Sequence, residues 1–124
     1  MPPSVVCDAG GVLVVSGALE GTTPANAEIL ALDWSSVTVG RFLAARHESD
    51  TERARLELGL ALSAVHEWFP VRTIVADTLQ RAGLDAGDAV DSWSAVLLAE
   101  HLAVPLFTAS DEVTSPRVEV IRPW

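Results

Sequence analysis

The sequence predicts one α/β domain in which a short parallel sheet lies between layers of helices. Short β-branched or apolar runs, such as residues 4–8 and 105–108, alternate with longer segments of helical composition. This alternation is typical of a parallel sheet that is covered on both faces. A length of 124 residues suits one domain rather than two. With 49% hydrophobic and 20% charged residues, the chain has the composition of a folded protein.

The first half of the chain is expected to begin with a buried strand and to continue in helices. The β-branched run at residues 4–8 forms the strand and is followed by a pair of glycines, which we interpret as a turn. A short helix then extends to about residue 19. Thr23 and Pro24 have the residue types of a helix cap and of a first helical position, so the next helix is expected to run from there to residue 46.

Residues 51–66 are predicted to form a helix with an excess of apolar surface. Ser49 and Glu52 have the spacing of a capping box. Alternating leucines at positions 56, 58, 60 and 62 would by themselves favour a strand, but the helix formers that precede them favour a helix. These leucines exceed what one buried stripe requires. We therefore expect part of this surface to be covered by another subunit or by a partner.

The second half is expected to alternate helices with two short strands. Pro70 marks the start of a helix that Gly83 ends, and residues 88–102 form the next helix. The apolar run at 105–108 is a buried strand whose leading proline is tolerated at the first strand position. Residues 118–121 form a last strand, at an edge of the sheet.

Composition excludes several classes of site. The chain has no lysine, which rules out a P-loop and Schiff-base chemistry. Eight arginines against 17 acidic residues give a net charge of −9, which opposes sequence-independent binding to nucleic-acid phosphates. The single cysteine, Cys7, cannot form an internal disulfide, and we interpret it as a small buried apolar residue.

The chain is expected to be cytoplasmic. Its apolar stretches are far shorter than the ~20 residues that a membrane-spanning helix needs. The first residues, MPPS, have neither the basic region nor the apolar core of a signal peptide.

Two stretches of the sequence resemble a known family of nucleases. VVCDAGGVLV at residues 5–14 and LLAEHLAVPLFTAS at residues 97–110 resemble the opening and the end of a PIN domain, the fold of VapC-type toxin ribonucleases. Asp8 matches the first acid of that family, and the second stretch usually ends in Thr-Ala-Asp. The resemblance covers most of the chain. It implies a PIN-like three-layer sandwich over residues 1–124.

Three serines stand where this resemblance places acids. The last acid of the Thr-Ala-Asp pattern corresponds to Ser110. Counting back without a gap from Glu100 places the acid that opens the preceding helix at Ser92. The segment ILALDWSSV at residues 29–37 resembles the helix that carries the family's glutamate, and that glutamate aligns with Ser35.

These replacements indicate that the nuclease site has decayed. The family's chemistry depends on Mg²⁺ or Mn²⁺, and such hard cations need three or four carboxylates to hold them and to generate the attacking hydroxide. Serine hydroxyls are neutral and bind such ions poorly. Asp8 with Ser35, Ser92 and Ser110 is therefore expected to hold a metal weakly or not at all. We expect no cofactor, and a PIN-fold protein that acts through protein binding or assembly.

The alternative is an active Mg²⁺-dependent endoribonuclease toxin that uses displaced acids. Asp33, Asp91 and Asp111 lie within two residues of the three serines. One step along a helix rotates a side chain by ~100°, which opposes such an exchange, most of all for Asp33. A helix start and a loop are adaptable, so Asp8, Asp91 and Asp111 form the metal and catalytic set of this alternative. In the purely structural interpretation, Asp91 or Asp88 caps a helix and Asp111 lies in a solvated turn.

The resemblance also implies partners. A homodimer is expected, together with a small antitoxin-like protein of a type II toxin–antitoxin pair. RNA is a ligand only in the alternative interpretation, and no membrane is involved. Asp8 is expected to stabilise the fold, as a carboxylate at a strand end that is held by backbone N–H groups. An unrelated small α/β domain is a third interpretation.

Overall fold

One parallel sheet of five strands, in the order β3-β2-β1-β4-β5, organises the computed structural model, which describes residues 2–82 and 89–124. Its strands are β1 (Ser4–Cys7), β2 (Glu28–Leu32), β3 (Glu67–Phe69), β4 (Leu106–Phe107) and β5 (Val120–Ile121). β1 is central, because it pairs with β2 on one side and with β4 on the other. The predicted α/β class with a short parallel sheet is confirmed.

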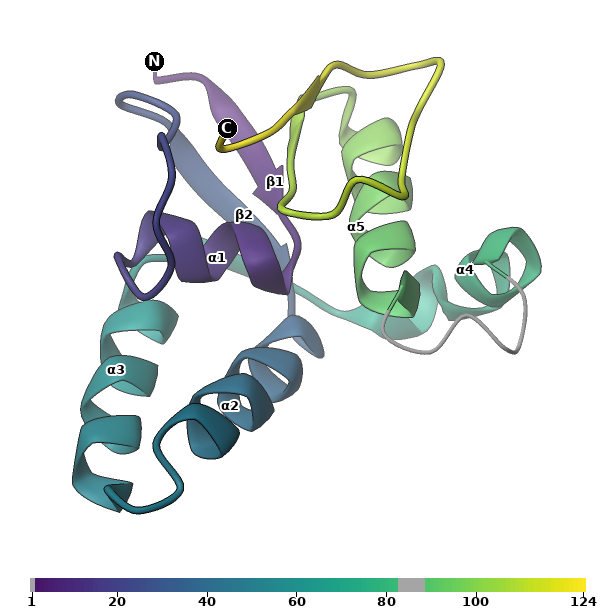
Figure 1. Ribbon diagram of the computed structural model, residues 1–124. Coiled ribbons are helices and arrows are strands. Elements are labelled where there is room, and N and C mark those ends of the chain that lie inside the picture. Colours follow the sequence, from purple (N-terminus) through teal and green to yellow (C-terminus); the bar gives the residue numbers. More distant parts are fainter. Residues whose placement is uncertain (1, 83–88) are drawn as a thin grey trace.

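Helices cover both faces of this sheet (Figure 1). They are α1 (Ala9–Val15), α2 (Ser35–Arg46), α3 (Thr51–Ser63), α4 (Val75–Ala82) and α5 (Ala89–Leu102), with a 3₁₀ helix η1 (Val71–Thr73) before α4. α1, α2 and α3 pack on one face, whereas α4 and α5 lie on the other. Of the helices that the structure describes, none has the length and apolar character needed to cross a lipid bilayer.

Alternating side chains of the central strands fill two cores. Val5 and Cys7 of β1 point into the core shared with α1, α2 and α3, whereas Val6 points into the core shared with α5. β2 shows the same alternation. Successive residues of a strand face opposite sides of the sheet. A strand that is covered on both faces is therefore apolar at nearly every position, which is why β1 and β2 show no polar alternation.

The helix predicted from residue 24 to residue 46 is wrong in its first half. Residues Glu28–Leu32 form β2, which pairs with β1 so that Val6 lies opposite Leu30, and α2 begins only at Ser35. A short apolar run fits a buried strand and a buried helix equally well. Here the pairing with β1, between two layers of helices, makes it a strand.

Smaller differences concern the ends of elements. The N-cap of α3 is Asp50, not Ser49, and its carboxylate accepts a hydrogen bond from the Arg53 backbone N–H at 3.1 Å. α3 ends three residues before the predicted end, and the short strand β3, which was not predicted, follows it. The helix predicted after it is split into η1 and α4. The predicted helix end at Gly83 and helix start at Asp88 lie outside the described residues.

The remaining elements agree with the sequence except at the end of α1, which was predicted near residue 19 but lies at Val15, because the chain turns at Gly17 with a φ of 88°. β1, β4 and the edge strand β5 fall within the three other predicted strands, and α5 ends at Leu102 as predicted. Cys7 is fully buried, as expected. Burial raises the pKa of its thiol, and the negative charge of Asp8 raises it further. A reactive thiolate is therefore disfavoured at this position.

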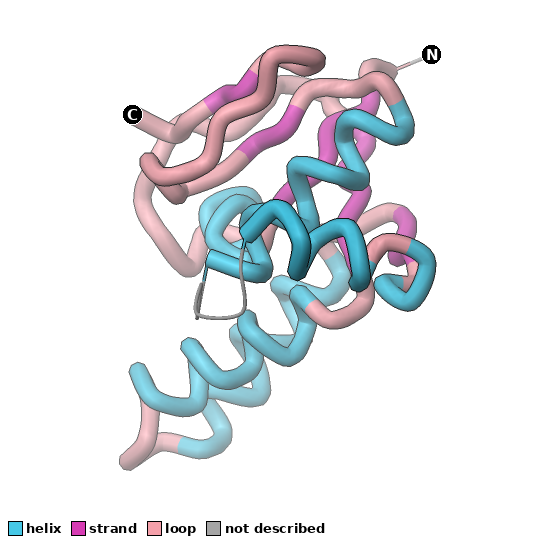
Figure 2. The backbone as a smooth tube through the Cα atoms, turned by 90° about the vertical axis from the view of Figure 1, so that its right-hand side faces the viewer, coloured by secondary structure: helices cyan, strands magenta, loops and turns pink. Residues whose placement is uncertain are grey.

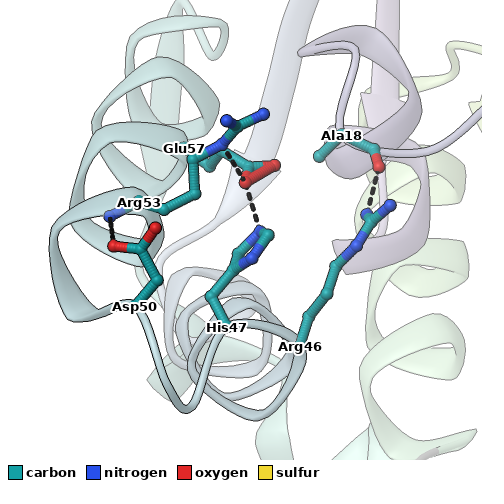
Figure 3. A network of polar contacts seen from close by, with 6 residues as sticks. All are labelled: Ala18, Arg46, His47, Asp50, Arg53 and Glu57. Atoms are coloured by element: carbon teal, nitrogen blue, oxygen red, sulfur yellow. Dashed lines mark hydrogen bonds and ion pairs between the residues drawn. The ribbon is translucent and has the colours of Figure 1, made fainter.

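α2 and α3 form a helical hairpin that extends past the sheet (Figures 1 and 2). Polar contacts fix its geometry (Figure 3). Glu57 of α3 contacts His47 at the end of α2 and also Arg53, whose Nε lies 3.3 Å from Glu57 Oε2. Arg46 of α2 donates a hydrogen bond to the carbonyl of Ala18, which follows α1. The hairpin is thus held both internally and against the end of α1.

A partly buried ion pair joins α4 to α5. Arg81 Nη1 lies 3.1 Å from Glu100 Oε1, and the Ser115 hydroxyl donates to the same carboxylate at 2.5 Å. Burial alone would raise the pKa of Glu100. The hydrogen bonds from Arg81 and Ser115, and the charges of Arg81 and Arg117, outweigh burial and hold this pKa below its ordinary value of 4.5.

Replacing Glu100 with glutamine should lower thermal stability near neutral pH, because the neutral amide loses the ion pair. A carboxylate with a lowered pKa contributes stability above its unfolded pKa, and this contribution is lost as the pH falls through the lower folded value. The difference between wild type and Glu100→Gln should therefore shrink below about pH 4. Thermal unfolding at a series of acid pH values measures the difference in melting temperature between wild type and Glu100→Gln. The exposed substitution Glu112→Gln is the control. A difference that persists undiminished in acid would contradict this assignment.

Candidate functional site

The strand order has its switch point between β1 and β4. β2 and β3 lie on one side of β1, and β4 and β5 lie on the other, so the chain changes direction across the sheet at this point. In open α/β sheets, ligands bind outside the carboxyl ends of the strands at such a switch point. Asp8 directly follows β1, and Thr108 directly follows β4.

Asp8 is buried at this edge, with 1% of its surface exposed. It is the N-cap of α1, because its Oδ1 accepts a hydrogen bond from the Gly11 backbone N–H at 2.7 Å. Its Oδ2 accepts from the Ser92 hydroxyl at 2.6 Å and also from the Thr108 hydroxyl. The Asp8 carboxylate thereby joins β1 to α1, α5 and the end of β4.

Gly10 and Gly11 are the residues that let α1 start so close to β4. The sequence suggested a turn at this pair, but both residues belong to the first turn of α1. A Cβ atom at Gly11 would lie 2.4 Å from the Phe107 carbonyl oxygen, and one at Gly10 would lie 2.9 Å from the Ala109 Cβ. Side chains do not fit at these distances. The glycines therefore allow the close approach that brings Asp8 and Thr108 together.

Asp91 lies in the first turn of α5 and binds α1 and α2. Its Oδ2 accepts a hydrogen bond from the Ala9 backbone N–H at 2.7 Å, and its Oδ1 accepts from the Ser35 hydroxyl at 2.6 Å. The Asp91 carbonyl accepts from Ser94, whose oxygen in turn accepts from the Trp34 indole at 2.9 Å. Two consecutive residues at the start of α5, Asp91 and Ser92, thus both reach the start of α1.

The three serines that align with missing acids are placed differently. Ser35 and Ser92 are buried, and each donates directly to one of the two carboxylates. Ser110 is half-buried beyond β4, and its backbone N–H donates to Thr108 Oγ1 at 3.0 Å. Ser110 is therefore linked to the Asp8 carboxylate through Thr108.

The displaced acids do not all gather at this edge. Asp91 joins Asp8 there, but Asp111 is exposed, and its side chain makes no hydrogen bond or ion pair within the described residues. Asp33 is also exposed and accepts a hydrogen bond from the Val71 backbone N–H at 3.2 Å. Within residues 2–82 and 89–124, no group of three or more His, Cys, Asp or Glu side chains could hold a metal ion.

Hydrogen bonds occupy both of the buried carboxylates. Every carboxylate oxygen of Asp8 and Asp91 accepts at least one hydrogen bond. Chemically, the arrangement is a set of buried acceptors that ties β1, α1, α2, β4 and α5 together.

Two polar residues of this network, Thr108 and Ser94, were not singled out from the sequence. Thr108 is completely buried and contacts Asp8. The signal that could have identified it is its place directly after a predicted buried strand, in the Thr-Ala-Ser stretch. Ser94 gives no such signal, because serine is common in helices and its contact with Trp34 joins distant parts of the chain.

Comparison with known proteins does not assign this chain to a family. No protein-family model matches it, and no curated protein matches its sequence. The α/β fold with its strand order and the geometry at the ends of β1 and β4 are therefore the basis for a function.

Proposed function

We propose that this chain is a PIN-fold protein of the VapC-like group in which a structural hydrogen-bond network replaces the nuclease site, and that it acts through protein binding or assembly. The observation that carries the proposal is the contact of Ser35 with Asp91 and of Ser92 with Asp8, each at 2.6 Å. The parallel sheet with β1 at its centre is compatible with that fold.

The exchange of acid for serine replaces a repulsion between carboxylates with a hydrogen bond. Carboxylates at positions 35 and 92 would place negative charges against Asp91 and Asp8, and like charges at hydrogen-bond distance repel unless a cation lies between them. A serine hydroxyl at the same place instead donates a hydrogen bond to the carboxylate. The network is thus satisfied without a metal, whereas a nuclease needs carboxylates that a metal must bridge.

Protein partners follow from the same proposal. We propose a homodimer and a small antitoxin-like protein as the partner classes. α3 supports an interaction role, because Leu56 and Leu60 are 62% and 56% exposed. Exposed leucines on one helix are typical of a surface that another protein covers.

Restoring the acids tests the proposal. The triple variant with Ser35→Glu, Ser92→Asp and Ser110→Asp should be less stable than wild type without metal, because two of the new carboxylates adjoin Asp8 and Asp91. Mn²⁺ should reverse this loss, since a ligand that binds only the folded state stabilises it by mass action. Thermal unfolding with and without Mn²⁺ measures both effects.

The matched control for the restored site is Ser49→Glu with Thr23→Asp and Ser63→Asp, which adds the same charges at exposed positions away from the carboxyl ends of β1 and β4. It should show no rescue by Mn²⁺. Wild type should show almost no response to Mn²⁺ and no RNA cleavage above background. A triple variant that gains no affinity for Mn²⁺ would show that the three serines do not occupy the acid positions.

The second candidate function is a Mg²⁺-dependent endoribonuclease that uses Asp8, Asp91 and Asp111. The placement of Asp8 and Asp91 at the same edge favours it. In that case wild type binds Mn²⁺ and cleaves RNA, and Asp111→Ala or Asp91→Asn abolishes both. Asp111 would have to move toward the other two acids, because its side chain is exposed in the structure.

A further inference from the structure

The face formed by α1, α2 and α3 carries an apolar groove beside an unpaired cation. The groove lies between α1 and α2 and has a volume of about 650 Å³. Leu13, Leu19, Phe42 and Ala45 contribute apolar surface to it, and Arg41 is the charged residue in its lining. We call it the α1–α2 groove. Its size and apolar lining suit a partner's side chains.

Arg41 is available to an incoming group. Its side chain is exposed and forms no hydrogen bond or ion pair within the residues that the structure describes. The chain has 17 acidic residues against eight arginines, so carboxylates are more numerous than cations on this protein. The groove therefore suits an apolar segment that also carries a carboxylate.

α3 of the same chain has these properties. Leu56 and Leu60 are exposed and lie one turn apart, with Gly59 beside them. Glu52 lies one turn before Leu56 on the same side of the helix, is exposed and forms no ion pair within the described residues. A Cβ atom at Gly59 would meet nothing within 4 Å, so this part of α3 is open. We call Glu52, Leu56, Gly59 and Leu60 the α3 stripe.

The groove and the stripe also match in length. The α2 residues of the groove run from Thr38 to Ala45, two helical turns or about 10 Å. The stripe runs from Glu52 to Leu60, or about 12 Å. Both surfaces are held rigidly relative to each other, because the contacts of Arg46, His47 and Glu57 fix the hairpin to α1 (Figure 3). A preorganised surface loses little conformational entropy on binding.

We infer that a second copy of this chain occupies the α1–α2 groove, with the α3 stripe of each protomer in the groove of its partner and Glu52 opposite Arg41. This arrangement is reciprocal, so a two-fold dimer uses both surfaces of both copies and leaves neither open. The inference rests on the proposed function in that it names the assembly through which the chain acts.

A charge exchange tests this dimer. Arg41→Glu alone and Glu52→Arg alone each place like charges in the interface and should weaken dimerisation roughly tenfold or more. The double variant restores an opposite-charge pair and should recover most of the affinity. Analytical ultracentrifugation of the full chain over a range of concentrations measures the dissociation constant of the dimer for each variant. Exposed Arg72→Glu and Glu112→Arg, which lie outside both surfaces, are the matched controls and should leave the dimer unchanged.

Variants in the α3 stripe distinguish a loss of dimerisation from a loss of folding. Leu60→Ser and Gly59→Leu should weaken the dimer while leaving the far-ultraviolet circular dichroism of the protein unchanged, because both positions are open in the protomer. A monomeric wild type at all concentrations would overturn the inference. So would a dimer that neither single charge reversal weakens, or one that the double variant does not restore. None of these results affects the metal response of the restored acids, so failure of this inference is distinct from failure of the proposed function.

Discussion

Replacing Asp8 with alanine should destabilise the protein by about 3 kcal/mol or more, because hydrogen bonds to a charged group contribute about 1.5 to 3 kcal/mol each. The change leaves the Gly11 N–H and the hydroxyls of Ser92 and Thr108 without their acceptor in a buried site. It also removes the cap of α1. Chemical denaturation of both proteins measures the difference in free energy of unfolding.

The opposing effect is the repulsion between Asp8 and Asp91, which the substitution relieves. Three donors to Asp8 outweigh it if the carboxylate is structural. Asp111→Ala is the matched control from the same region, and as an exposed residue it should change stability by less than about 0.5 kcal/mol. If Asp8→Ala proves as stable as wild type, the acid is instead held at a cost in stability, as in active sites.

Replacing Gly11 with alanine is the second large effect that we expect. The added Cβ would lie 2.4 Å from the Phe107 carbonyl oxygen and 3.1 Å from the Cys7 Cβ. Both contacts are to groups near the backbone of central strands, so α1 has to move away from the sheet. Overpacking of this kind costs about 1 to 3 kcal/mol, and loss of the hydrogen bond to Asp8 adds to it.

Gly40→Ala is the matched control, because it makes the same substitution in another helix of the same protein. Its Cβ would meet Leu58 at 3.9 Å, which is ordinary contact. Alanine should therefore stabilise α2 by about 0.5 to 1 kcal/mol relative to glycine. Thermal unfolding of the two variants should show shifts of opposite sign. Equal shifts would mean that the tight approach of α1 to β4 is not required.

Patterns local in sequence predicted much of the fold. The β-branched run of β1 and the capping residues before α3 predict their elements because backbone preference and burial agree there. β2 was missed because an apolar run such as EILAL has no period that separates a buried strand from a buried helix. Only its pairing with β1 distinguishes the two, and pairing is not a local property.

The candidate site was predictable only in part, for the same reason. Asp8 lies at a strand end, where the sequence indicates a functional or structural carboxylate. Its partners Ser92 and Thr108 are 84 and 100 residues away, and Ser35 reaches Asp91 across 56 residues. The rotation of ~100° per helical residue argues that Asp91 points away from the position of Ser92.

The structure shows why that rotation does not separate Asp91 from the site. The start of α5 lies beside the start of α1, so consecutive residues in its first turn contact different parts of the same short helix. Asp91 reaches the Ala9 N–H, and Ser92 reaches the carboxylate that caps the helix. The angle at which one helix end meets another depends on packing of the whole domain, which the sequence pattern does not specify.

A titration with Mg²⁺, followed through the backbone amide NMR signals of Ala9 and Gly11, tests most directly whether the buried carboxylates are structural. These two N–H groups donate to Asp91 and Asp8 and would respond to a metal bound there. The proposed network predicts that both signals keep their positions through millimolar Mg²⁺. A saturable shift of both signals that disappears in Asp91→Asn would show that the carboxylates hold a metal, and would contradict a structural role.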